Sequence, residues 1–327
     1  MRAYISLESP TPRIILSVWA TARVAPCRLC PALTPQFFKL FKLPLMHRTL
    51  IASDTLSAHL SDPDWVIVDC RSSLADLDYG RRVYAESHLP GAVYANLEED
   101  LSSPVIPGQT GRHPLPDIAV LAAKFAAWGI GEGVQVVVYD DRSGGIAARL
   151  WWLLRWLGHE AVAVLDGGWQ GWIGQGLPVS AAIPVPTPCN FQPKPHPEML
   201  ADVEQVEAIR GDDHYKLVDS REQIRYEGKH EPIDPVAGHI PGAVNLPFAN
   251  HVGSDGRLAS PESIRNQWLS VLGKTPPEQT VVYCGSGVTA CFNLLTMEHA
   301  GLEGARLYPG SWSEWIADPA RPVGKAG

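Results

Sequence analysis

Two stretches of this sequence decide its fold, and each is a version of the other. Residues 135–145 read Gln135-Val-Val-Val-Tyr-Asp-Asp-Arg-Ser-Gly-Gly, and residues 280–289 read Thr280-Val-Val-Tyr-Cys-Gly-Ser-Gly-Val-Thr. Each begins with a short apolar run, which is typical of a parallel strand buried on both faces. Each run continues into a loop and then into an apolar segment at helical spacing, at 146–157 and 288–299. The same strand, loop and helix are therefore predicted twice.

The repetition continues on both sides of these loops. An apolar run ends in Asp-x-Arg at 65–71 and again at 216–221, and His-x-Pro-Gly-Ala-Val occurs at 88–93 and at 239–244. A helical pattern followed by Gly occurs at 117–128 and at 262–272. Strands that alternate with helices predict an α/β fold of two tandem domains, each a mostly parallel sheet flanked by helices. In such sheets, ligands bind beyond the carboxyl ends of the strands.

Prolines mark the boundary between the two halves. Seven of them between residues 178 and 197 exclude a helix or a central strand, which predicts a stiff, extended linker. We therefore expect one domain at 46–177 and a second at 198–327. Residues 1–45 are basic and show no sustained pattern, so three interpretations compete. They are a targeting peptide, a disordered tail, and a translation start placed before the true one at Met46.

The composition excludes several classes of protein. A net charge of -8 and a pI near 5.8 give no cationic surface for a nucleic acid or an anionic membrane. No apolar run reaches the ~18 residues that a membrane-spanning helix needs. The 6 cysteines lack the density and spacing of a disulfide framework, which favours a reducing compartment such as the cytoplasm, or an organelle if residues 1–45 are a targeting peptide.

The two halves differ at one decisive position. After the strand, the first half carries Asp140 and the second half carries Cys284. A cysteine at the tip of a parallel strand, followed by small residues and a helix, lies where several backbone N–H groups can converge on its sulfur. Such a site favours the nucleophilic thiolate, so we predict that Cys284 is catalytic and that the first half is not. The alternative is a small buried residue.

Other uses of these cysteines have less support in the sequence. The phosphatase motif Cys-x5-Arg would require arginine at position 290, which is Ala290. Cys27 and Cys30 have the spacing of half a zinc site, but no second pair of ligands lies nearby, so neither a metal nor a cofactor is expected. A non-catalytic binding module or sulfur carrier is a remote alternative, because one of the two loops does carry a cysteine.

From Met46 to about Asp318, the sequence resembles the rhodanese family of sulfurtransferases, in its tandem halves, its Asp-x-Arg and His-x-Pro-Gly-Ala segments and its cysteine-free first loop. Within the family, the loop from Cys284 to Thr289 resembles that of members specific for 3-mercaptopyruvate, whereas thiosulfate-specific members carry Arg-Lys after the cysteine. A physical argument agrees, because the thiosulfate dianion calls for cations beside the sulfur. The resemblance implies a sulfurtransferase that passes sulfur from 3-mercaptopyruvate through a Cys284 persulfide and releases pyruvate. Thiosulfate is the alternative donor.

The resemblance also assigns roles to residues. It implies that Arg225 binds the carboxylate of the small donor, and that a second substrate arginine of many relatives is replaced by Ile233. It implies a proton relay of a serine, a histidine and an acid, and an acceptor that is cyanide or a thiol, such as that of a thioredoxin-like protein. The relay maps to Ser286, His113 and Glu98, and the loop residues around the donor are Gly285, Gly287, Val288 and Thr289.

Overall fold

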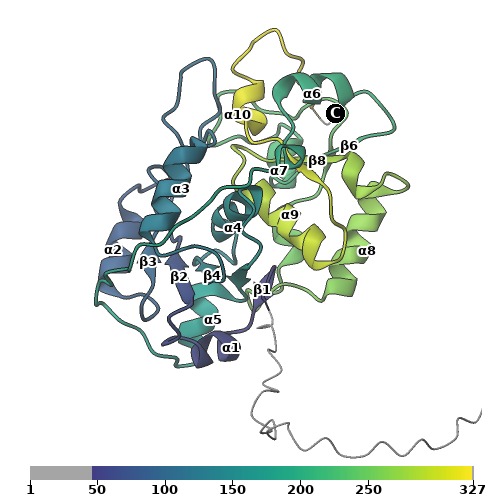
Figure 1. Cartoon of the computed structure of the whole chain (residues 1–327). Helices are drawn as coiled ribbons and strands as arrows, with labels where there is room; N and C mark the ends of the chain where they lie inside the picture. The colour runs from purple at the N-terminus through teal and green to yellow at the C-terminus, as the bar shows by residue number, and fades with distance from the viewer. Residues whose placement is uncertain (1–45, 326–327) are drawn as a thin grey trace, which may run out of the picture. The chain divides into compact units, whose positions relative to one another are not determined.

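The computed structural model describes residues 46–325, in which two parallel sheets are flanked by helices (Figure 1). Both sheets form where the sequence predicts buried apolar runs. The three interpretations of residues 1–45 and the Cys27 to Cys30 pair concern residues outside this described part. Among the described helices, none combines the length and apolar character that crossing a bilayer requires.

The first sheet has the order β1-β5-β4-β2-β3, and all of its strand pairs are parallel. Its strands are β1 (Leu50–Ile51), β2 (Trp65–Asp69), β3 (Val93–Tyr94), β4 (Gln135–Tyr139) and β5 (Val162–Leu165). Every residue of β4 is buried, as expected for an interior strand covered on both faces. The register aligns Asp69 with Tyr139, so the ends of β2 and β4 meet at one edge.

The second sheet repeats this arrangement with the order β7-β6-β8-β9, again parallel throughout. Its strands are β6 (Lys216–Asp219), β7 (Val244–Asn245), β8 (Thr280–Tyr283) and β9 (Arg306–Leu307). Asp219 is aligned with Tyr283, as Asp69 is with Tyr139 in the first sheet. The loops that begin at Asp140 and Cys284 therefore leave equivalent interior strands at the carboxyl edge of each sheet.

The helices begin and end at the residues that their sequences favour. The side chain of Asp117 accepts hydrogen bonds from the N–H groups of Ala119 and Val120, and Ser260 caps its helix in the same way. The helices are α1 (Ser53–Ala58), α2 (Tyr79–Glu86), α3 (Ile118–Ala127), α4 (Ala147–Trp156), α5 (Gly168–Gly174), α6 (Val203–Ile209), α7 (Gln223–Tyr226), α8 (Pro261–Leu272), α9 (Thr289–His299) and α10 (Ser311–Trp315). Within residues 46–325, three short 3-10 helices lie at Pro197–Met199, Phe248–His251 and Pro277–Gln279.

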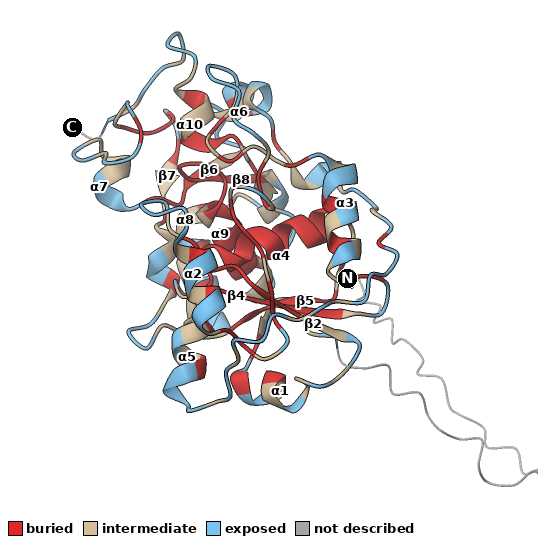
Figure 2. Cartoon of the chain, turned by 90° about the vertical axis from the view of Figure 1, so that its left-hand side faces the viewer, coloured by how far each residue is buried: buried red, intermediate tan, exposed pale blue. Residues whose placement is uncertain are grey.

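Helices α4 and α9, which follow the two loops, pack against each other in the middle of the protein. Every residue of α4 is buried, and Figure 2 shows both helices as the buried centre between the two sheets. One apolar cluster, which includes Val138, Trp151, Cys284 and Phe292, runs through this centre and draws on both halves. The two halves therefore share a core, which fixes the two loops relative to each other.

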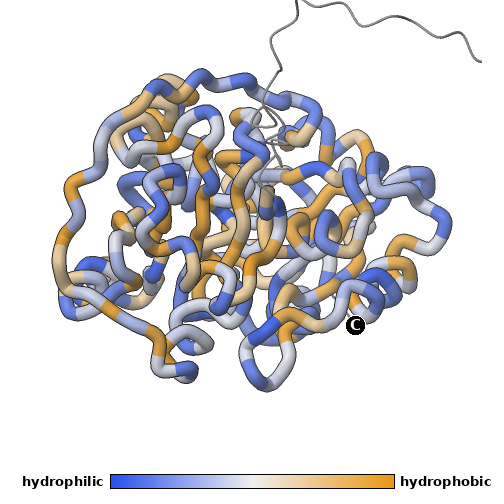
Figure 3. The backbone as a smooth tube through the Cα atoms, turned by 60° about the horizontal axis from the view of Figure 1, so that its bottom comes forward, coloured by the Kyte–Doolittle hydropathy of each residue, from blue (hydrophilic) through white to orange (hydrophobic). Residues whose placement is uncertain are grey.

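Each sheet also has an apolar cluster on its outer face. Tyr139 and Trp172 belong to that of the first sheet, and Tyr283, Trp312 and Trp315 belong to that of the second. In Figure 3, hydrophobic segments, in orange, run through the middle of the molecule, and many of the hydrophilic segments, in blue, lie at its periphery. The tryptophans of these clusters, Trp172, Trp312 and Trp315, are fully buried.

The proline-rich stretch between residues 178 and 197 contains no helix before Pro197 and runs along the first half. Ser180 pairs with His88 in an isolated antiparallel bridge. Further on, the N–H groups of Lys194 and His196 donate to the carbonyls of Leu157 and Trp156. The extended conformation is the one that its prolines favour.

Candidate active site

Cys284 lies directly after β8, in the loop that leads into α9, and only 2% of its surface is exposed. Its N–H group donates to the hydroxyl of Ser311 at 3.1 Å, and its carbonyl accepts from the N–H of Trp312 at 3.0 Å. Ser311 has a positive φ of 55°, a backbone conformation that is strained for a residue other than glycine. The start of α10 therefore holds the backbone of Cys284 in place.

The loop after Cys284 offers several unused backbone donors. Among the described residues, no backbone carbonyl accepts from the N–H groups of residues 285–290, which lead into the first turn of α9. Gly287 allows this path, because its φ is 77° and a Cβ there would lie 2.3 Å from the carbonyl oxygen of Pro309. Unpaired N–H groups at a helix start favour an anion.

The same loop in the first half holds an anion of its own. The carboxylate of Asp140 accepts hydrogen bonds of 2.7–2.8 Å from the N–H groups of Arg142, Gly144, Ile146 and Ala147. Asp140 is fully buried, and burial raises the pKa of its carboxyl while these four donors act in the opposite direction. This loop geometry is therefore able to surround a negatively charged group without a side-chain cation.

Three predicted site residues from the two halves form a hydrogen-bonded row. The Oγ of Ser286 lies 2.6 Å from Nδ1 of His113, and Nε2 of His113 lies 2.9 Å from Oε1 of Glu98. An ionised carboxylate can only accept, so Nε2–H donates to Glu98 and the serine hydroxyl donates to Nδ1. His113 is 3% exposed, and its hydrogen bond lowers the pKa of Glu98. The row can move a proton beside Cys284.

Arg149 of α4 contacts both the loop and the row, and no pattern in the sequence points to this position. It is fully buried and donates to the carbonyls of Gly287 at 3.0 Å and of His113 at 3.1 Å. Burial lowers the pKa of its guanidinium. Because it donates to one carbonyl of the cysteine loop and to the carbonyl of the histidine, Arg149 fixes the loop relative to His113.

Arg225 of α7 is near the loop but is already paired with two acids. Its Nε and Nη2 groups donate to Glu231 at 3.0 and 2.7 Å, and Nη2 also donates to Asp234 at 3.1 Å. A Cβ built on Gly285 would lie 3.6 Å from Nη2 of Arg225, which places the guanidinium at the loop. Ile233, the residue in place of a second arginine, is 44% exposed.

Arg221 has the structural role that its position after Asp219 suggests. It donates to the Asp219 carboxylate at 2.6 Å and lies over the ring of Trp312 at 4.8 Å. In the first half, Arg71 makes the same pair with its own aspartate and lies over Trp169. Because the pair occurs in both halves, it belongs to the fold rather than to the cysteine.

A further arginine at the loop, Arg112, is not predicted from the sequence, because it comes from the first half. Arg112 donates through Nε and Nη2 to the two oxygens of Asp234 at 3.0 and 3.2 Å. Its Nη2 lies 2.8 Å from the position of a Cβ on Gly285. Only the contact between the halves brings it there, so no local motif could have revealed it.

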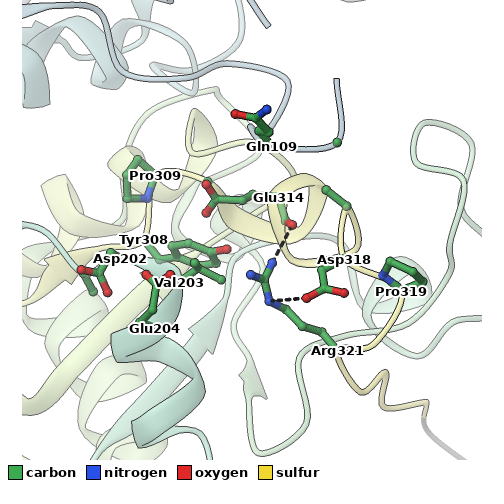
Figure 4. A pocket seen from close by; sticks show the side chains of 14 residues that line it. Gln109, Asp202, Val203, Glu204, Tyr308, Pro309, Glu314, Asp318, Pro319 and Arg321 are labelled. Atoms are coloured by element: carbon green, nitrogen blue, oxygen red, sulfur yellow. Dashed lines mark hydrogen bonds and ion pairs between the residues drawn. The ribbon is translucent and has the colours of Figure 1, made fainter. Parts of the chain in front are cut away.

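A cavity of about 700 Å³ lies against α10, and Pro309 and Gly310 are among the residues that line it. Figure 4 shows its acidic lining, with Glu314 and Asp318 close to Arg321. Burial raises the pKa of Glu314. Cys284 does not line this cavity. The cavity is therefore separate from the site assembled around the cysteine.

Comparisons with known proteins agree with this architecture. The model of the Rhodanese-like domain matches the chain twice, at residues 52–175 and 202–318. A Pseudomonas aeruginosa protein named "Probable 3-mercaptopyruvate sulfurtransferase" is 50% identical over 84% of this chain and 97% of its own length. The thiosulfate sulfurtransferase of Bos taurus is 37% identical over 72% of this chain and 80% of its own.

Among solved structures, the 3-mercaptopyruvate sulfurtransferase from Leishmania major is similar with a TM-score of 0.73. It is 33% identical and covers 82% of this chain and 74% of its own. The relatives thus share one fold and are named for one class of reaction. Their names specify different sulfur donors.

Proposed function

Because the chain belongs to the rhodanese family and is a tandem-domain sulfurtransferase, we propose that its sulfur donor is 3-mercaptopyruvate and that Cys284 carries the sulfur as a persulfide. The observation that supports this donor most directly is the uncharged loop from Cys284 to Thr289, with arginine beside it rather than in it. Mercaptopyruvate keeps its carboxylate apart from its sulfur, which suits a neutral sulfur cradle and a separate cation.

In the first step, the thiolate of Cys284 attacks the sulfur of mercaptopyruvate. The new bond joins the two sulfur atoms, the bond between sulfur and carbon breaks, and its electron pair leaves on carbon as the enolate of pyruvate. Arg225 holds the carboxylate during the attack. The proton that leaves the Cys284 thiol when the thiolate forms passes through Ser286 to His113, and the Glu98 carboxylate stabilises the resulting imidazolium. The enolate then takes this proton back through Ser286.

In the second step, the acceptor removes the outer sulfur of the persulfide. A thiolate, such as that of a thioredoxin-like protein, attacks this sulfur, and the Cys284 thiolate leaves. Cyanide serves in the same way and yields thiocyanate. Between the steps, the N–H groups of Gly285, Gly287, Val288 and Thr289 are available to stabilise the anionic outer sulfur, as the first loop does for the carboxylate of Asp140.

Thiosulfate is the second candidate donor, because relatives that carry its name are also similar to this chain. It would bring two negative charges to a loop that has no side-chain cation in residues 284–289. Comparison of kcat/KM for the two donors tests the choice. We expect mercaptopyruvate to be preferred, and a higher kcat/KM for thiosulfate would reverse the assignment.

The role of Cys284 is tested by mass spectrometry after incubation with mercaptopyruvate. The intact protein should gain one sulfur, and the gain should be absent in Cys284→Ser. The described cysteines Cys70, Cys189, Cys284 and Cys291 are all free, which suits a reducing compartment, and we propose the cytoplasm. A persulfide that still forms in Cys284→Ser would assign the carrier to another cysteine.

A further inference from the structure

Arg149 of α4 carries a buried positive charge that no carboxylate neutralises. Its side chain is fully buried, and its donors reach backbone carbonyls, those of Leu101, His113 and Gly287, at 3.0–3.4 Å. Among the residues that the structure describes, no Asp or Glu side chain forms an ion pair with it. Buried charges are normally paired, because desolvation of a lone ion is costly. An anion close to Arg149 would offset this cost.

Two cysteines are the groups that can supply such an anion. Burial lowers the pKa of Arg149, and the charges of Cys291 and Cys284 act in the opposite direction. Burial raises the pKa of Cys291 to about 12, so this thiol stays neutral near pH 7. Cys284 is the residue that carries a negative charge in the proposed cycle, first as the thiolate and then as the persulfide. Cys284 is therefore the group that can offset the charge of Arg149.

The peptide group between Gly287 and Val288 connects Arg149 with the cysteine loop. Nη1 of Arg149 donates to the carbonyl of Gly287 at 3.0 Å, and among the described residues no peptide bond is cis. In a planar trans peptide the C=O and the N–H point in opposite directions. The N–H of Val288 therefore points away from Arg149, and no described backbone carbonyl accepts from it.

The first half shows what this N–H can bind. Val288 is the fourth residue after Cys284, and Gly144 is the fourth residue after Asp140. The N–H of Gly144 donates to the Asp140 carboxylate at 2.8 Å. The equivalent donor in the second half is thus the one that Arg149 orients, and the equivalent acceptor is the group carried by Cys284.

We propose that Arg149 is a positioning residue for sulfur transfer, which aims the Val288 N–H at the sulfur of Cys284 and places a fixed positive charge on the opposite side of that peptide. The inference rests on the proposed function, because it takes the persulfide as the anion that forms during turnover. The backbone of α10 also holds the carbonyls of Cys284 and Gly285, but through neutral N–H groups. The half whose loop lacks a cysteine thereby supplies a cation to the uncharged loop of the other half.

The other charged and titratable groups around the loop have partners of their own. They are Arg112 and Arg225, which pair with Asp234 and Glu231, and His113, which pairs with Glu98. The formal charges of the two arginines and their two acids cancel. Replacement of Arg112 or Arg225 would free a buried carboxylate, whereas replacement of Arg149 removes one positive charge and leaves every carboxylate paired as before.

Alkylation of Cys284 by iodoacetamide, an uncharged reagent, tests the proposal without turnover. In Arg149→Met, which keeps a long side chain without a charge, the rate at pH 7 should fall about tenfold, because a nearby opposite charge favours the reactive thiolate. The fall should shrink as the pH rises, because the thiol then ionises without the cation. Arg149→Lys keeps the charge and should recover most of the rate. The rates are measured by mass spectrometry of the peptide that contains Cys284, because Cys189 is also exposed.

Arg265→Met is the matched control, since Arg265 also donates to two backbone carbonyls, those of Ala300 and Gly301, but just beyond the carboxyl end of α9. It should leave the alkylation rate as in the wild type. Should Arg149→Met not fold, Arg149→Gln takes its place, with the same expected fall.

Three results would overturn the proposal. An unchanged rate in Arg149→Met would exclude an effect of the charge on the thiolate. A rate that is lowered equally at every pH, or equally in Arg149→Lys, would indicate a purely structural role for Arg149.

Steady-state kinetics separate this inference from the proposed function. Arg149→Met should lower kcat for mercaptopyruvate roughly tenfold and leave KM within about threefold of the wild type, because Arg149 acts on the loop and not on the donor. If the wild type turns over mercaptopyruvate and Arg149→Met does so with the same kcat and the same alkylation rate, only the inference fails. If the wild type forms no persulfide from mercaptopyruvate, the proposed function fails, and alkylation still decides whether Arg149 stabilises the thiolate.

Discussion

Asp140 and Cys284 are structural equivalents, each the first residue after an interior strand at the carboxyl edge of its sheet. The loop of Asp140 directs four backbone N–H groups at a carboxylate with two oxygen atoms. A cysteine persulfide is also a two-atom group with a terminal negative charge. The half whose loop lacks a cysteine thus contains, as a permanent side chain, an analogue of the intermediate that we propose for the other half.

This equivalence predicts that Cys284→Asp folds normally but is inactive. The N–H groups of residues 285–290 should donate to the new carboxylate, as those of the first loop donate to Asp140. We expect the free energy of unfolding to change by less than about 1 kcal/mol, whereas most charges introduced at a buried site are far more destabilising. Urea denaturation measures it, and a loss of several kcal/mol would show that the second loop cannot hold an anion.

The converse substitution, Asp140→Asn, should destabilise the protein. The amide NH₂ would face N–H donors that now point at a carboxylate oxygen, and at least one of them would lose its partner in a fully buried site. The expected loss is about 2–3 kcal/mol. Asp117→Asn is the control, because asparagine caps a helix as well as aspartate does. Equal stability of the two variants would contradict the prediction.

Ser286→Ala and His113→Asn should lower kcat for mercaptopyruvate roughly 100-fold, because the enolate would depend on water for its proton. Binding should change little, so KM should stay within about threefold of the wild type. His59→Asn removes another histidine that is hydrogen-bonded to an aspartate, Asp62, and should have no effect. A large rise in KM with unchanged kcat would instead assign the row to donor binding.

The Glu98 carboxyl predicts a particular dependence of stability on pH. Its hydrogen bond with His113 lowers the pKa of Glu98 in the folded protein, so the folded state favours the charged carboxylate. The resulting stabilisation is fully present above the ordinary glutamate pKa of about 4.3 and is lost as the pH falls through the lowered value. The difference in Tm between the wild type and Glu98→Gln should therefore be constant near neutral pH and shrink in acid. A difference that grows in acid would contradict this sign.

Much of the fold could be predicted from the sequence, because local patterns repeat at equivalent places in both halves. The apolar runs at Gln135–Tyr139 and Thr280–Tyr283 form the predicted strands, and the helices that follow begin within one residue of the predicted starts. Parallel strands buried on both faces have no polar face, and Gly and Pro mark their turns. The position of Cys284 at the end of a strand follows from these patterns alone.

Tertiary structure alone decided what surrounds that cysteine. The positions of Arg112 and Arg149 at the loop depend on the shared core around α4 and α9, and side-chain contacts between distant segments leave no local periodicity in a sequence. The pairing of Arg225 with Glu231 and Asp234 likewise could not be predicted from the sequence. The sequence by itself determined the strands, the loops and the position of Cys284 at the end of a strand, since these depend on residues near in the chain. The cations and the hydrogen-bonded row around Cys284 depend on how the two halves pack, which only the folded structure specifies.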